Sequence, residues 1–386
     1  MKIISLPLAV CGTFLSFGTP LFCHEKPTKE TASEKAEAEA PKIQLALLLD
    51  TSNSMDGLIQ QAKTELWSIV NTFGNTRKDG QQAFVEVALY EYGNNSLSEE
   101  SYWIREVLPF TRDLDRLSEE LFALTTHGGE EYCGAVVRRA VQQLQWAETP
   151  GTYKAIFVAG NEPFNQGPID PGSACREAMG AGVVVNSIHC GDEATGVSTG
   201  WKSGALVTGG SFSVIDQNKE VAAIECPQDK IIIELNGKLN ETYIRFGSKG
   251  QEFKANQLRQ DENAASSHEA QVNRAVTKAT GNYWNRSWDL VDACQEAEFD
   301  WSTVKKEHLP EEMQGLSVAE CKALVAEKTA ERAAIQKRIQ ELNKERAAYL
   351  AVERKRLSGE EGQTLGAEVR RAVTAQARAL GYRLGE

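Results

Sequence analysis

The chain has 386 residues, a formal net charge of −12 and 41% hydrophobic residues, so it can bury a substantial core and form two units of ordinary domain size. An acidic chain without a basic patch lacks the electrostatic footprint of nucleic-acid binding, and we expect no RNA or DNA partner. The P-loop, G-x-S-x-G, H-E-x-x-H and C-x-x-C motifs are also absent, so we expect a non-enzymatic protein.

The first 23 residues are predicted to be a signal peptide. Met1-Lys2 is followed by an apolar stretch that reaches Phe22, which is typical of a secretory signal. We therefore expect an exported protein, periplasmic or extracellular, or one that keeps residues 1–23 as a membrane tether. Residues 24–41 are rich in Lys, Glu and Ala and predict a disordered charged linker.

Residues 42–225 alternate between strand-like and helix-like segments. A near-continuous apolar run over residues 43–48 predicts a strand that is buried on both faces of a sheet. Further strands are expected at 82–92, 153–159, 183–189 and 211–215, and helices at 114–124, 132–146, 173–179 and 201–207. This alternation predicts an α/β fold, a doubly wound and mostly parallel sheet flanked by helices. Ligand sites of that architecture lie at the carboxyl ends of the strands.

The first strand runs directly into Asp50-Thr51-Ser52-Asn53-Ser54, a D-x-S-x-S loop, and then into a helical pattern. Its alternate residues offer one carboxylate and two hydroxyls, which are hard oxygen ligands suited to Mg²⁺, Mn²⁺ or Ca²⁺. Plain capping of the helix by Ser52 or Ser54 is the alternative. The strand-loop-helix context favours a metal site.

This loop and the element order from Pro41 to Glu225 resemble a von Willebrand factor A (VWA) domain with its metal-ion-dependent adhesion site (MIDAS). The resemblance implies a divalent cation, Mg²⁺ or Mn²⁺ rather than Ca²⁺, that bridges the protein to a carboxylate of its partner. It therefore implies binding rather than catalysis, with an acidic residue of another exported or envelope protein as the ligand.

The resemblance also implies a Thr in a second loop and an Asp at the end of the central strand, and the chain departs from both. Glu130 occupies the Thr position, and Gly160 occupies the Asp position, with Asn161 or Glu162 nearby. We expect Glu130 to restore the lost anionic ligand, directly or through water. The alternative is that Glu130 and Glu131 only favour the positive N-terminus of the next helix. The expected metal residues are Asp50, Ser52, Ser54, Glu130 and Asn161.

Three cysteines are expected on the same rim. Export favours disulfides, and Cys175 with Cys190 is our first choice of pair, with Cys133 as the third candidate. A zinc site built from Cys133, Cys190, His127 and His189 is one alternative. A redox-active thiol at a helix N-terminus is another.

The C-terminal half is expected to be helical. Apolar residues from Ile232 to Phe246 fit one helix face within a 226–310 helical extension, although Asn236-Gly237 is a competing hairpin signal. Residues 316–357 contain no Gly or Pro and predict a long helix, the first arm of a 316–380 helical hairpin. A seam with heptad-like spacing suggests a coiled coil or self-association, although Arg346 interrupts it; its apolar members are Ile335, Ile339, Leu342 and Tyr349.

These features predict an exported, non-enzymatic protein-binding module of the adhesion or scaffold kind. A structural envelope protein with a vestigial metal site is the main alternative. A thiol- or metal-dependent enzyme is a further one.

Overall fold

The computed structural model describes residues 40–218, 224–356 and 364–384. The expected signal peptide and nearly all of the expected linker lie outside these ranges. None of the described helices is long and apolar enough to cross a membrane.

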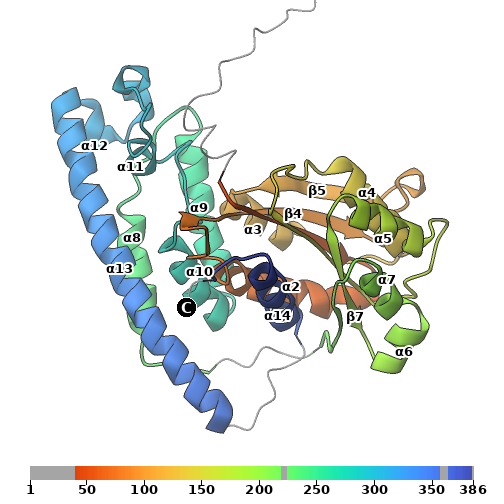
Figure 1. Ribbon diagram of the computed structural model, residues 1–386. Coiled ribbons are helices and arrows are strands. Elements are labelled where there is room, and N and C mark those ends of the chain that lie inside the picture. Colours follow the sequence, from red (N-terminus) through yellow and green to blue (C-terminus); the bar gives the residue numbers. More distant parts are fainter. Residues whose placement is uncertain (1–39, 219–223, 357–363, 385–386) are drawn as a thin grey trace, which may run out of the picture.

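A six-stranded sheet forms the first half of the chain, with the strand order β5-β4-β1-β6-β7-β8 (Figure 1). The strands are β1 (Lys42–Asp50), β4 (Phe84–Tyr92), β5 (Ile104–Thr111), β6 (Tyr153–Gly160), β7 (Val184–Cys190) and β8 (Phe212–Ile215). Only the edge strand β5 runs antiparallel to its neighbour. The carboxyl ends of β1, β4, β6 and β7 therefore share one rim.

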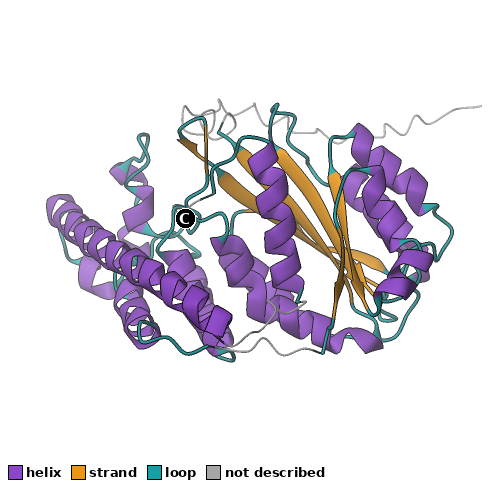
Figure 2. Cartoon of the chain, turned by 60° about the horizontal axis from the view of Figure 1, so that its bottom comes forward, coloured by secondary structure: helices purple, strands orange, loops and turns teal. Residues whose placement is uncertain are grey.

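Helices cover both faces of this sheet (Figure 2). They are α2 (Asp56–Asn71), α3 (Leu114–Ala123), α4 (Cys133–Gln143), α5 (Pro171–Gly180), α6 (Glu193–Ser198) and α7 (Trp201–Val207). Strand β1 alternates between two cores, with Leu45 and Leu47 in one and Ala46 and Leu48 in the other. The predicted doubly wound, mostly parallel sheet is confirmed, and the apolar run of β1 is explained by its burial on both sides.

The second half is helical: α8 (Asp229–Asn240), α9 (Gly250–Ala264), α10 (His268–Lys278), α11 (Leu290–Ala293), α12 (Glu311–Gln314) and α13 (Val318–Arg356). The competing hairpin signal was wrong, because Asn236-Gly237 lies inside α8. This helical region is packed onto the sheet unit. The guanidinium of Arg274 on α10 is 1% exposed and pairs with Asp115 on α3 at 2.8 Å.

Helix α13 is a single helix of 39 residues. Three of the four predicted seam residues, Ile335, Ile339 and Leu342, join the main core, and α13 packs against α8 and α10, whereas Tyr349 is 37% exposed. Arg346, which looked like an interruption, is also buried there. Its guanidinium lies 2.7 Å from Asp229 on α8 and 2.6 Å from Glu269 on α10. A buried carboxylate pair thus explains the charged residue in the seam.

The expected helical hairpin is corrected by α14 (Leu365–Ala379), which packs against α2, β6 and β7 instead of lying along α13 (Figure 1). Its apolar stripe, which includes Val369 and Val373, enters the core of the sheet unit. The carboxylate of Glu65 on α2 holds its first turn, accepting the backbone N–H of Gly366 at 2.6 Å. The helical region therefore lies, in sequence, between the last strand of the sheet and a helix that covers the sheet.

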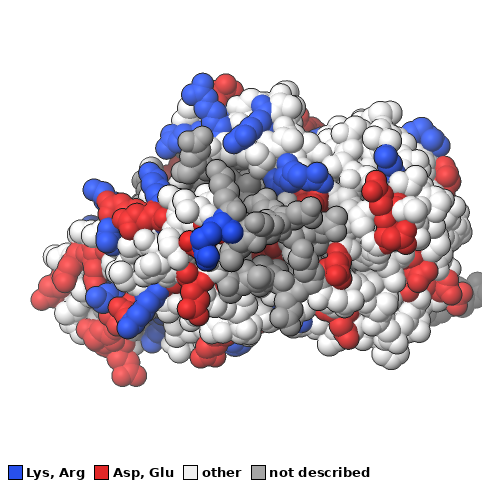
Figure 3. Space-filling view, turned by 90° about the horizontal axis from the view of Figure 1, so that it is seen from below, with Lys and Arg blue, Asp and Glu red and all other residues white. Residues whose placement is uncertain are grey.

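Acidic and basic side chains are interspersed on the face seen in Figure 3, rather than gathered into one basic patch.

Candidate metal centre

Asp50, the last residue of β1, lies at the centre of the rim and is fully buried. Its Oδ1 accepts the backbone N–H of Ser52 at 2.8 Å, while Oδ2 has no hydrogen-bond partner in the described chain. Burial raises the pKa of Asp50 to about 7, although the hydrogen bond from the backbone N–H of Ser52 offsets part of the rise. A buried carboxylate oxygen without a partner is costly to keep.

The two serine hydroxyls of the first loop lie next to each other. Ser52 Oγ and Ser54 Oγ are 3.3 Å apart. A short 3-10 turn, η1 (Asn53–Met55), follows Ser52 and leads into α2, and the Ser52 side chain makes no capping hydrogen bond to it. The capping alternative for Ser52 was therefore wrong.

The third loop reaches the first loop through Asn161. Its Nδ2 donates to Ser54 Oγ at 3.1 Å, and its Oδ1 is buried without a partner in the described chain. The preceding residue, Gly160, has no room for a side chain. A Cβ there would lie 2.5 Å from the Tyr92 hydroxyl and 2.9 Å from Asp50 Oδ2. The structure thus brings Asn161 to the site and closes position 160 to an aspartate.

The second loop gives a correction. Glu130 is exposed, and its Oε2 accepts Gln166 Nε2 at 3.2 Å, so it does not join Asp50 as expected. Glu131 is 7% exposed and turns toward the site. A Cβ on Gly93 would lie 2.7 Å from Glu131 Cγ and 3.0 Å from Asp50 Oδ1, so both side chains border the same point. Aligning the two glycines had selected Glu130, whereas Glu131 is the glutamate of this loop that borders Asp50.

Glu131 sits in an acidic environment. Burial, Asp50 and Glu162 together raise its pKa to about 7. Neither Asp50 nor Glu131 is ion-paired within the described chain. An alternation argument could have found Glu131, because two adjacent residues of an extended loop point to opposite sides.

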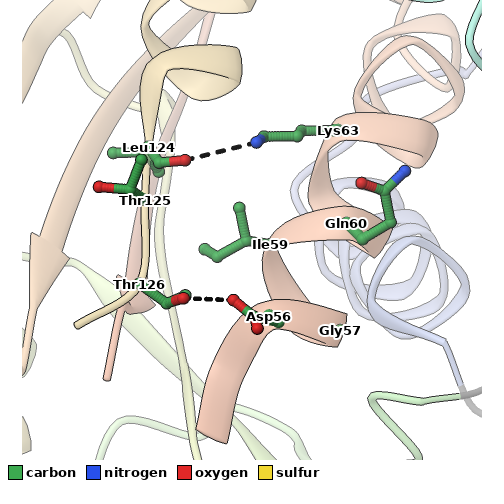
Figure 4. Close-up of a pocket in the computed structure, with 8 residues that line it drawn as sticks. All are labelled: Asp56, Gly57, Ile59, Gln60, Lys63, Leu124, Thr125 and Thr126. Atoms are coloured by element: carbon green, nitrogen blue, oxygen red, sulfur yellow. Dashed lines mark hydrogen bonds between the residues drawn. The ribbon is translucent and has the colours of Figure 1, made fainter. Parts of the chain in front are cut away.

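A pocket of about 640 Å³ lies beside the first loop, between α2 and residues 124–126 (Figure 4). The Thr126 hydroxyl donates to Asp56, and Lys63 Nζ donates to the backbone oxygen of Leu124 at 3.4 Å. These bonds tie the chain before the second loop to the helix that follows the first loop.

The donor set fits a divalent cation. Two orphaned oxygens, Asp50 Oδ2 and Asn161 Oδ1, lie with the hydroxyls of Ser52 and Ser54 and near the Glu131 carboxylate, and all are hard oxygen ligands. The described residues contain no group of three His, Cys, Asp or Glu side chains placed to hold a metal. A cation here would therefore depend on hydroxyl and amide oxygens as well as carboxylates.

The cysteines do not pair as expected. Cys133, Cys175 and Cys190 are all free thiols. Cys190 packs into the core on one face of the sheet, and Cys133 and Cys175 pack into the core on the other, so the expected Cys175–Cys190 bridge is not formed. Burial raises the pKa of the Cys175 thiol to about 11, which opposes a reactive thiolate there. The zinc alternative with His127 and His189 was wrong, since no such cluster exists among the described residues.

The doubly wound, mostly parallel sheet and the D-x-S-x-S loop at the carboxyl end of β1 are the arrangement that the resemblance implies. The sheet unit is a VWA-like domain. No protein-family model matches the chain, and no curated protein matches it.

Solved structures resemble the VWA-like domain at low identity. Proximal thread matrix protein 1 from the mussel byssus, with a zinc-occupied MIDAS motif, is 16% identical over 47% of this chain and 43% of that chain, with a TM-score of 0.36. BatB from Bacteroides thetaiotaomicron is 16% identical over 45% of this chain and 90% of its own, with a TM-score of 0.34. The SpRpn10 VWA domain is 16% identical over 47% of this chain and 98% of its own, at 0.33. These TM-scores are low, so the fold assignment rests on strand order and the first loop. The match spans less than half of the matrix protein.

Proposed function

We propose that this chain is an exported, non-enzymatic binding module whose VWA-like domain holds a divalent cation at Asp50 and uses it to engage an acidic group of a protein partner. The observation that carries the proposal is the pair of orphaned oxygens, Asp50 Oδ2 and Asn161 Oδ1, at the rim of the sheet. Buried acceptors normally have partners. A cation would satisfy both, which explains why the fold retains them.

The residues that would hold the cation are Asp50, Ser52, Ser54 and Asn161. Their oxygens suit Mg²⁺ or Mn²⁺, which bind through few protein ligands and keep other positions for water or an incoming group. When bound, the cation supplies a Lewis-acidic position that accepts a carboxylate oxygen. Asp50 fixes the cation at the strand end, and Asn161 ties the third loop to the first through its 3.1 Å bond to Ser54.

Calorimetric titration of the full chain with Mn²⁺ tests the cation site. We expect about one Mn²⁺ per chain in the wild type, none in Asp50→Ala, and unchanged binding in Glu193→Ala, an exposed acidic residue near the carboxyl end of β7, which is separated from β1 by β6. Equal binding by the wild type and Asp50→Ala would contradict the site.

Water-proton relaxation tests the open position. Mn²⁺ on the protein should keep at least one exchangeable water, and the relaxation enhancement should fall when glutarate is added as a carboxylate probe. An unchanged enhancement at saturating glutarate would contradict carboxylate binding.

One observation favours the structural alternative, a scaffold protein with a vestigial site. Position 160, where the resemblance implies an aspartate, is closed by Tyr92 and Asp50. That alternative predicts no Mn²⁺ binding by the wild type in the same titration.

A further inference from the structure

We propose that Glu131 is the second carboxylate ligand of the cation site and replaces the aspartate that the VWA resemblance implies at the end of β6. This inference rests on the proposed cation at Asp50. It places the second carboxylate on the β4 side of β1, opposite the β6 side where the resemblance implies an aspartate.

Strand β1 has β6 as one neighbour and β4 as the other. Asp50 Oδ2 lies beside Gly160, at the end of β6, where no side chain fits. Asp50 Oδ1 lies beside Gly93, just after β4, and Glu131 Cγ borders the same point. Gly93 has φ of +78°, a conformation that favours glycine, and any side chain there would meet both acidic groups. The free approach to Asp50 for a second carboxylate is therefore on the β4 side.

The second loop is fixed in a way that selects Glu131 over Glu130. The backbone N–H of His127 donates to the Thr51 oxygen at 2.9 Å, which joins this loop to the first metal loop. The backbone N–H of Asn95 donates to the Gly128 oxygen at 2.9 Å. Gly129 then touches the chain after β4, because a Cβ there would lie 2.4 Å from the Gly93 oxygen. Because residues 127–129 are held in place, the side chain of Glu130 points outward and the side chain of Glu131 points toward Asp50.

The two glutamates differ in their partners. Glu130 is exposed and bonded to Gln166. Glu131 is 7% exposed and has no hydrogen bond or ion pair to another residue of the described chain. Two carboxylates this close and this buried repel each other when both are ionised. A doubly charged cation between them removes that repulsion and gives both a partner, so the geometry explains why an acidic residue stands at 131.

The test compares Glu131→Gln with Glu130→Gln in the full chain, using Mn²⁺ as the probe and calorimetry plus the Mn²⁺ electron paramagnetic resonance signal as readouts. Loss of one charged ligand should weaken Mn²⁺ binding by about tenfold or more, because ligand charge sets the affinity of such sites. Glu130→Gln should stay within about twofold of the wild type. Glu131→Asp, which keeps the charge on a shorter side chain, should recover part of the affinity and covers the case in which Glu131→Gln does not fold.

Each outcome separates this inference from the proposed function. Wild-type Mn²⁺ affinity in Glu131→Gln, with binding lost in Asp50→Ala, overturns the role of Glu131 and leaves the cation site intact. Equal losses in Glu130→Gln and Glu131→Gln overturn the assignment to Glu131 alone. Absence of Mn²⁺ binding by the wild type overturns the cation site itself, and this inference with it.

Discussion

Replacing Asp50 with Asn should stabilise the metal-free protein at pH 8. The carboxylate is fully buried with one unpartnered oxygen, and its pKa rises from 3.8 to about 7. Since one pKa unit corresponds to about 1.4 kcal/mol, a rise of about three units means that the ionised form costs the fold about 4 kcal/mol. Local relaxation and water entry reduce this cost, so we expect Asp50→Asn to gain about 1–3 kcal/mol in unfolding free energy. The amide oxygen can still accept the N–H of Ser52.

The pH dependence has a definite sign. The folded pKa of Asp50 lies above its unfolded value, so the folded chain binds more protons between about pH 4 and 7. The stabilisation from protonated Asp50 is fully present below pH 3.8 and is lost as the pH rises through about 7. The gain in unfolding free energy of Asp50→Asn over the wild type should therefore grow from pH 5 to pH 8 and then level off. Glu131 also has a raised pKa, so its ionisation likewise lowers the unfolding free energy as the pH rises. This contribution is smaller in Asp50→Asn, because the Asp50 charge is one cause of the raised pKa of Glu131.

Urea unfolding in EDTA at pH 5, 6.5 and 8, followed by tryptophan fluorescence, measures this difference. Glu193→Gln, an exposed change near the same rim, should match the wild type at every pH. An Asp50→Asn variant that is less stable than the wild type at pH 8, or a stability difference that does not change with pH, would show that the ionised Asp50 carboxylate does not destabilise the fold.

Three further outcomes are expected. Gly160→Asp should lose about 2 kcal/mol or more instead of restoring a site, because its Cβ would meet the Tyr92 hydroxyl at 2.5 Å, and adding Tyr92→Phe should recover part of the loss in urea unfolding. Val373→Asp on α14 should cost at least about 3 kcal/mol, whereas Val352→Asp, 64% exposed on α13, should stay within about 0.5 kcal/mol; equal effects would contradict the packing of α14 on the sheet. Arg332→Met should lower the unfolding free energy by about 3–5 kcal/mol, because Arg332 neutralises the buried Asp289 at 2.7 Å and Asp292 at 2.6 Å. A decrease in melting temperature of less than about 1 °C would contradict that role.

Much of the sheet unit could be predicted because its information is local. Strand β1 is apolar at every position from Leu45 to Leu49, and α2 repeats its apolar residues at helical spacing. The alternation of such segments limits the topology to a doubly wound sheet. The D-x-S-x-S loop was also predictable, since its candidate ligands lie within five consecutive residues.

The remainder depends on contacts between distant segments. The sequence of residues 365–379 predicts an apolar helix face but does not indicate that this face packs beside α2. A hairpin with the preceding helix was therefore the simpler interpretation. Arg346 looked like a defect in a seam because its partners, Asp229 and Glu269, lie on other helices. The Cys175–Cys190 pair failed for a similar reason, since the face of the sheet that each thiol enters is decided by packing.

The choice between Glu130 and Glu131 shows most clearly what the sequence alone cannot predict, namely the direction of each side chain. Their order in the sequence is known, but the direction of each side chain depends on where the loop is held. Backbone contacts to Thr51, Gly93 and Asn95 set that direction. A one-residue shift along an extended loop exchanges the inward and outward positions.

The central claim is that a divalent cation binds at the end of β1. An anomalous difference map from crystals of the full chain grown with Mn²⁺ tests it most directly. We expect one strong peak about 2 Å from an oxygen of Asp50 and beside the hydroxyls of Ser52 and Ser54. A map without a peak at Asp50, at Mn²⁺ concentrations that saturate exposed acidic sites elsewhere on the molecule, would contradict it.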